Sequence, residues 1–146
     1  MANDLARPIR RAALACRKGD ADLTAIIPAA SLYPQTTPAN VAWPFGKIGV
    51  ISAFPLRAGC VDGCTGIFAG HVFAKDRQEG GAVVETAEDH ASRAAAAMAA
   101  ALDRQVLDLD GGRRVMVLWT GSRVMQDGAE AGAYHGVVNF EFRALA

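Results

Sequence analysis

Apolar and polar residues alternate most regularly near the end of the chain, at residues 137–143. Successive side chains of a β-strand point to opposite faces, so Val138, Phe140 and Phe142 are expected to face a core. The other face of this strand would carry three polar side chains: Asn139, Glu141 and Arg143. Asp-Gly at 127–128 is typical of a turn, so residues 109–145 predict a β-hairpin that ends in this two-faced strand.

A helix is predicted near the start of the chain, from about Arg7 to Gly19. Pro8 fits the first turn of a helix, and a glycine often ends one. The apolar side chains of this segment fall on one stripe, with arginines on the opposite side: Leu5, Ile9, Ala12, Ala13 and Cys16. Asp20 is expected to cap a second, short helical turn, which Pro28 limits.

Residues 31–44 have the composition of a long loop, with three prolines among polar residues. Within it, Leu32 and Tyr33 are suited to a brief pairing with a strand. Long loops in compact domains are often functional.

Two strands are predicted after this loop. Residues 45–56 are apolar on both faces, as expected for a central strand, and a second strand is predicted at residues 65–75. The glycine-containing residues 57–66 are expected to link these two strands in an antiparallel pair.

The next predicted element is a helix that Thr86 caps and that reaches about Arg104. Glu88 and Asp89 lie in its first turn, where negative charge complements the helix dipole. Its apolar stripe consists mostly of alanines: Ala87, Ala91, Ala94, Met98, Ala101 and Leu102. A packing partner can approach such a helix closely, and a sheet is the expected partner.

These elements predict an α+β fold in the order helix, strand, strand, helix, strand, strand. The last pair begins with residues 115–119, after a Gly-Gly turn at 111–112. We expect a four-stranded, mainly antiparallel sheet, packed by the N-terminal helix and the central alanine-rich helix. A length of 146 residues with 51% hydrophobic residues suits one domain over residues 1–146.

Charge and hydropathy exclude several classes of protein. Fifteen basic residues balance fifteen acidic ones, so no global field draws the chain to nucleic acid or to an anionic membrane. No stretch approaches the roughly 20 apolar residues of a membrane span, and arginines interrupt any signal-peptide pattern. We expect synthesis and assembly in the cytoplasm, with reduced cysteines.

Cys60 and Cys64, four residues apart, could bind a soft metal together with His71 or His90. Structural zinc sites use four ligands, usually in two close pairs, and this chain offers one loose pair. A plain turn with two small thiols is the favoured interpretation. The glycines around these cysteines precede a strand rather than a helix, so they do not form a phosphate-binding loop.

Each histidine could be combined with Cys60 or Ser52 and an aspartate into a catalytic triad. However, no sequence signature of a catalytic nucleophile surrounds any of these candidates. We expect His71 on a sheet face, His90 exposed on a helix and His135 at the start of a strand. No catalytic, cofactor or metal site is therefore predicted, and the chain is not expected to be an enzyme.

Aromatic and charged residues at loops, turns and the outer strand face are the remaining candidates. Trp119 is expected in the core, whereas Trp43, in the proline-rich loop, is either packed or a docking anchor. The two arginines beside the Gly-Gly turn suit a solvated strand edge. The candidate interaction residues are Trp43, Arg57, Asp62, Arg113, Arg114, Asn139, Glu141 and Arg143.

Taken together, the segments resemble a family of small tail completion proteins of long-tailed phages and gene transfer agents, known as tail terminators or tail-to-head joining proteins. The resemblance follows the order of the segments, and the last one is the most specific. Besides the alanine-rich helix, it rests on residues 23–27, 32–34, 48–51, 62–64, 71–74, 111–113, 122–127 and 134–142.

The resemblance implies a structural virion protein without active-site residues. Such proteins form a ring, typically hexameric, that caps the tail tube and joins the tail to the head connector. The implied partners are other copies of the chain, the major tail tube protein, a head-tail connector or stopper protein, and DNA passing through the lumen without specific binding. No membrane is involved, and the implied location is the tail-head junction of a particle.

Two alternatives remain open from the sequence. One is a head-side stopper or adaptor ring, which shares the size and the location. The other is a small cytoplasmic enzyme that uses Cys60 or Cys64 with a histidine.

Overall fold

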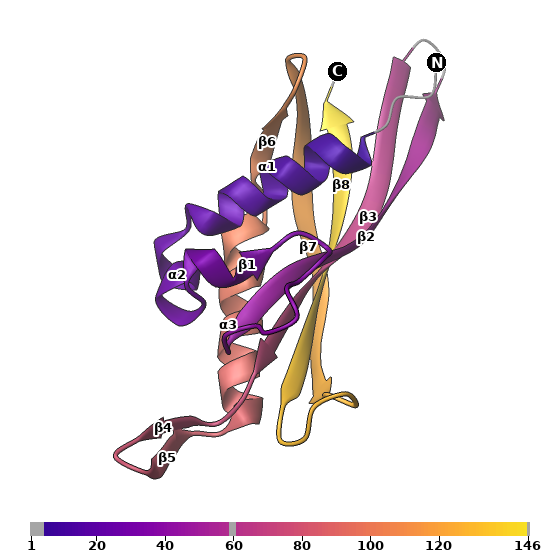
Figure 1. The fold of residues 1–146 in the computed structure, drawn as a ribbon. Helices are drawn as coiled ribbons and strands as arrows, with labels where there is room; N and C mark the ends of the chain where they lie inside the picture. Colours follow the sequence, from indigo (N-terminus) through magenta and orange to yellow (C-terminus); the bar gives the residue numbers. More distant parts are fainter. Residues whose placement is uncertain (1–4, 59–60, 146) are drawn as a thin grey trace.

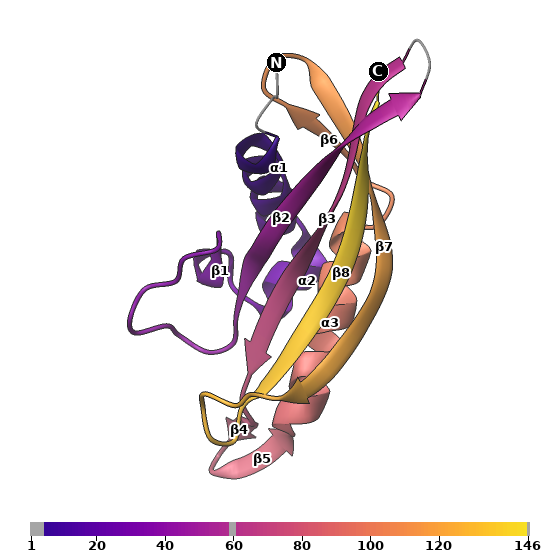
Figure 2. The same ribbon diagram turned by 90° about the vertical axis from the view of Figure 1, so that its right-hand side faces the viewer.

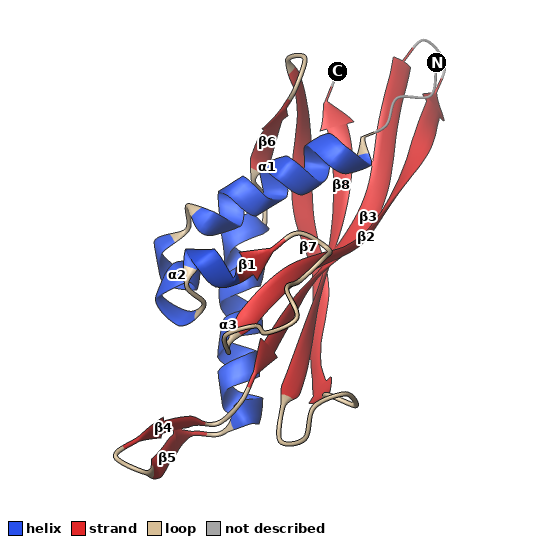
Figure 3. Ribbon diagram, viewed as in Figure 1, coloured by secondary structure: helices blue, strands red, loops and turns tan. Residues whose placement is uncertain are grey.

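Three helices pack on one face of a curled, six-stranded sheet (Figures 1 and 3). The computed structural model describes residues 5–58 and 61–145. The strands follow the order β1-β2-β3-β8-β7-β6, and a separate pair, β4-β5, extends from the body. The predicted α+β class is confirmed, but the sheet has six strands rather than four.

Four long antiparallel strands form the centre of the sheet: β2 (Phe45–Ala58), β3 (Val61–Ala74), β8 (Tyr134–Leu145) and β7 (Arg113–Gln126). Two short strands lie at its edges. β1 (Leu32–Tyr33) runs parallel to β2, as the brief pairing in the loop predicts, and β6 (Val106–Leu109) pairs with the start of β7.

The expected link at residues 57–66 is wrong, because β2 and β3 remain paired up to Ala58 and Val61. Gly63 and Gly66 lie within β3 rather than in a turn, and Gly66 serves packing. A Cβ on Gly66 would lie 2.3 Å from the Phe142 ring and 2.3 Å from the Ser52 carbonyl oxygen. The sequence pattern cannot distinguish such a strand glycine from a turn glycine.

Helix α3 (Ala87–Leu102) has the predicted cap and the predicted close packing. The Thr86 hydroxyl accepts a hydrogen bond from the Asp89 backbone N–H at 3.2 Å. Strand β8 approaches closely, since a Cβ on Gly136 would lie 3.2 Å from the Ala95 Cβ. The stripe of small side chains therefore rests directly on the sheet.

The N-terminal segment forms α1 (Ala6–Lys18), α2 (Ala21–Ile26) and a 3₁₀ turn at Ala29–Ser31. Asp20 caps α2 by accepting from the Leu23 N–H at 2.8 Å, as predicted. The expectation that arginines lie opposite the apolar stripe fails at Arg17, which is fully buried. One nitrogen of Arg17 donates to the Tyr33 carbonyl, and burial lowers its pKa to about 10.

Strands β4 (Arg77–Glu79) and β5 (Ala82–Glu85) were not predicted, because they interrupt a segment that is polar and short. Gly80 and Gly81 both have positive φ, 57° and 82°, which suits the tight two-residue turn of a hairpin. Strand β6 escaped the sequence pattern for a similar reason, since it has only four residues.

Within the part of the chain that the structure describes, no helix is long and apolar enough to cross a membrane.

Candidate interaction surfaces

The face of the sheet opposite α1 and α3 carries no helix among the described residues (Figure 2). We call this surface the open face. Alternate side chains of the four long strands point to it, and on β8 these include Asn139, Glu141 and Arg143. Their partners on the covered face, Val138, Phe140 and Phe142, are each at most 1% exposed. The inward and outward faces of this strand are therefore as predicted.

The polar stripe on β8 is flanked by apolar side chains. Glu141 lies opposite Ile67 of β3 on one side and Leu118 of β7 on the other. Ile67 is 55% exposed, and Phe54, one strand further, is 50% exposed. The open face is thus a mixed surface, in which charged residues alternate with large exposed hydrophobic ones.

Aromatic side chains cover the opposite end of the open face. Phe73 stacks between Phe45, at 4.7 Å between ring centroids, and His135, at 4.3 Å. Trp43 contacts Phe45 edge-on at 4.9 Å, and the Lys75 ammonium lies 4.6 Å from the Trp43 ring. Trp43 is half-buried and packs within this cluster, and its use as a docking anchor stays a prediction.

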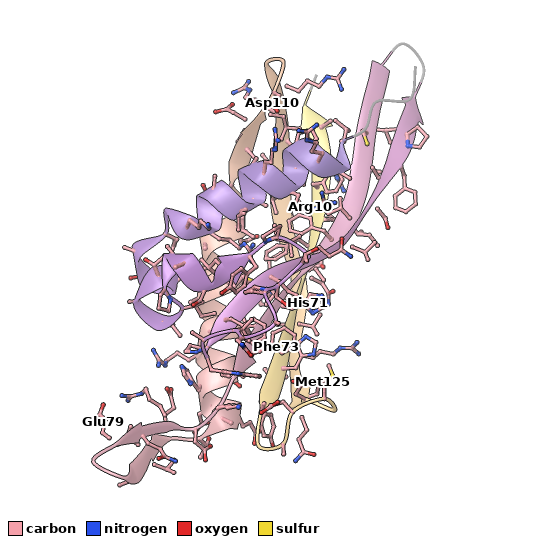
Figure 4. All side chains as sticks on the ribbon, in the orientation of Figure 1. Arg10, His71, Phe73, Glu79, Asp110 and Met125 are labelled. Atoms are coloured by element: carbon pink, nitrogen blue, oxygen red, sulfur yellow. The ribbon has the colours of Figure 1, made fainter. Side chains whose placement is uncertain are left out.

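His71 and His135 meet in this cluster, with 2.8 Å between Nδ1 of His71 and Nε2 of His135 (Figure 4 labels His71 and Phe73). One neutral imidazole donates to the other. Burial, then the nearby His135 and Lys47, lower the pKa of His71 to about 4. Burial also lowers the pKa of His135. Both predicted strand positions are right, and their contact was not predicted.

Two other placements from the sequence are wrong. His90 is buried, because it lies on the sheet side of α3, and its Nδ1–H donates to the Lys75 carbonyl at 2.9 Å. Trp119 is 47% exposed although it points to the covered face, because β6 and α3 leave it uncovered there. Its ring nitrogen donates to the Ser122 hydroxyl at 2.9 Å.

The cysteine hypotheses gain no support from the geometry. Cys60 lies outside the described residues. Cys64 packs against the core, and burial raises the pKa of its thiol, which lowers the fraction of reactive thiolate. His71 lies seven positions along the same strand, a span of roughly 23 Å. Over the described ranges, no three His, Cys, Asp or Glu residues converge as a metal site.

The remaining predicted residues lie near one end of the sheet. Arg57 and Asp62 are paired across β2 and β3 through their backbones. Arg113 and Arg114 are exposed at the start of β7, opposite Leu109 and Asp108 of β6. The open face holds Asn139, Glu141 and Arg143 of the predicted set, and the use of these candidates as interaction residues stays a prediction.

A groove between α3 and β7 is a surface that the sequence did not reveal. One wall consists of Ala95, Ala96, Ala99 and Ala100, and Trp119 and Val124 lie opposite, around a volume of about 590 Å³. Among the described strands, β6 covers only residues 113–116 of β7. The edge of β7 beyond Trp119 therefore has no neighbouring strand in this part of the chain. The only sequence signal is that α3 has alanines on its outer side as well.

The sequence and the fold were compared with those of known proteins. No curated protein matches the chain. A solved structure described as "Virion of native gene transfer agent (GTA) particle" has a TM-score of 0.76 and 19% identity, over 98% of both chains. A second solved structure has a TM-score of 0.58 and 18% identity, over 97% of both chains. These two likenesses establish the fold.

The family is established separately, by sequence. The family model described as "Tail completion protein gp17" matches residues 11–145, nearly the whole chain. The resemblance found in the order of strands, turns and the alanine-rich helix is confirmed by this match. This chain is a member of the tail completion protein gp17 family.

Proposed function

We propose that this protein is a structural component of a phage or phage-like particle, where it forms a ring at the tail-head junction. The ring, a hexamer, caps the tail tube and contacts the head connector, and DNA passes through it without specific binding. Family membership supports the tail role, and the solved structure with the same fold is described as part of a gene transfer agent virion. The proposal assigns no reaction to the chain.

The observation that carries the proposal is the uncovered open face with its large apolar side chains. Val50 is 69% exposed there and lies near Ile67, and Phe54 follows four residues further along β2. Soluble monomers rarely expose contiguous apolar surface of this kind unless another protein covers it. Glu141 and Arg143 add charges of both signs, as expected at a specific interface rather than at a purely hydrophobic one.

Light scattering and electron microscopy, on the purified protein alone and with purified tail tube, test the proposal. We expect a ring of identical subunits, formed alone or on the tube end. A chain that stays monomeric and ignores the tube overturns the proposal. Labelling on intact particles distinguishes the tail end from a head-side stopper position.

A matched pair of variants tests the open face. Ile67→Asp places an unpaired charge in the apolar part of this surface and should weaken ring or tube binding at least tenfold. Ala39→Asp, in the exposed loop, introduces the same charge away from it and should have no effect. Circular dichroism of both variants checks that the fold is retained.

A further inference from the structure

The β4-β5 hairpin forms an arm, residues 77–85, that points away from the body of the molecule (Figures 1 and 4). Except for Glu85, all residues of its two strands are exposed. Val83 and Val84 are adjacent and are 51% and 46% exposed. An isolated two-stranded hairpin is only marginally stable in water, so an arm of this kind needs support.

Helix α3 supplies this support at the base of the arm. The carboxylate of Asp76 accepts from the Ala87 N–H at 2.8 Å, and His90 donates to the Lys75 carbonyl. Both oxygens of Glu85 accept from the Arg93 guanidinium at 2.8 Å. These contacts orient the arm before any partner binds, which reduces the entropy lost on binding.

The α3-β7 groove offers a complementary surface. Its wall of alanines leaves room for an added side chain, and the adjacent edge of β7 can accept a further strand. A strand added at this edge would point alternate side chains to the two faces of the sheet. One of Val83 and Val84 would then enter the groove beside α3, and the other would extend the apolar part of the open face.

We propose that the arm of one copy docks in the α3-β7 groove of a neighbouring copy and adds a strand to the free edge of its β7. Two different surfaces of the same chain meet in this contact, so it is heterologous and can close into a ring. Exposed Arg123 lies on the free part of β7 with its side chain on the open-face side, and exposed Glu79 on the arm, which pairs with Arg77 within the hairpin, has the opposite charge, which favours a strand added along this edge. The inference rests on the proposed ring of identical copies.

Photo-crosslinking tests the contact directly. A photoreactive residue replaces Ala82, which leaves both valines intact, in ¹⁵N-labelled protein mixed with unlabelled protein and tail tube. We expect adducts that join the labelled arm to unlabelled residues 95–103 or 119–124. Adducts elsewhere, or none, overturn the inference whether or not a ring forms, and a ring with adducts elsewhere leaves the proposed function intact.

Two variants should each remove one half of the contact. Val83→Asp places a charge on the arm, and Ala96→Trp fills the groove from an exposed helix position. Each should raise the concentration needed for ring formation at least tenfold, whereas Gln78→Asp, on the other strand of the arm, should not. Melting curves check folding.

Mixing the two variants gives a sharper result. A Val83→Asp chain keeps its groove and an Ala96→Trp chain keeps its arm, so a mixed pair retains one intact contact. We expect heterodimers in the mixture and no closed ring. A mixture that remains monomeric, or variants that form normal rings, contradict the arm-in-groove contact.

Discussion

Protonation of the His71–His135 pair should make the folded protein less stable as the pH falls below neutrality. The pKa of His71 is lowered to about 4 in the folded state, from an ordinary value of 6.5. Between these two values the unfolded chain binds more protons than the folded one, so stability rises with pH. The contribution is complete above about pH 6.5 and is lost as the pH falls towards 4.

The magnitude follows from the size of this shift. One pKa unit corresponds to about 1.4 kcal/mol, which gives an upper limit of about 3.4 kcal/mol for the full titration of His71. At pH 5 the same relation gives about 2 kcal/mol. His71 is partly exposed, and solvent screening reduces this to about 1 kcal/mol. His135 contributes in the same direction, since its pKa is also lowered.

Urea denaturation at pH 7.5 and pH 5.0 measures the effect away from the range where most carboxylates titrate. The wild-type free energy of unfolding should fall by at least about 1 kcal/mol between the two conditions. In His71→Gln the loss should shrink by about 1 kcal/mol, and in the variant with both histidines replaced by glutamine it should shrink further. If wild type and His71→Gln lose the same amount, the reasoning about the pair is wrong.

Three further predictions concern the fold. Gly66→Ala should destabilise the protein by about 1–3 kcal/mol, because the new Cβ would meet the buried Phe142 ring and a backbone oxygen. Gly128→Ala, where a Cβ has open space, should change stability little. Equal effects of the two variants in chemical denaturation would contradict this. Thr86→Ala should cost about 1 kcal/mol in the same assay through the lost cap of α3, and Thr86→Ser should retain most of it. Arg17→Met should leave stability unchanged or raise it, because two buried guanidinium nitrogens of Arg17 lack hydrogen-bond partners within the described structure. A decrease of more than about 2 kcal/mol in the free energy of unfolding would refute this.

The local pattern of apolar and polar residues was sufficient to predict the helices and strands that are long and have one buried face. The alternation in residues 137–143 predicted the two faces of β8, and the spacing of the alanines predicted α3 together with its cap. The family resemblance also rested on the order of such segments, and the match over residues 11–145 confirms it. Each of these signals is contained in a short stretch of chain.

Signals that depend on distant contacts were missed. Trp119 follows the alternation that buries Val115 and Val117, yet it is exposed because β6 pairs only with residues 113–116 and a groove separates the Trp119 side chain from α3. His90 is buried on the sheet side of α3, where the Lys75 carbonyl, fifteen residues away, accepts its N–H. The arm and the groove are likewise invisible to periodicity, since one is short and the other is formed by two elements.

The open face could line the bore of the proposed ring or contact another protein. The side chains around the polar stripe on β8 distinguish these two uses. A bore filled with water and DNA would leave Ile67 and Phe54 in contact with solvent, which is unfavourable for large apolar side chains. A protein partner would bury these apolar side chains and would also contact Glu141 and Arg143, which already form an ion pair with each other at 3.6 Å. Burial by a protein partner is therefore the more favourable use of this part of the open face in the proposed ring.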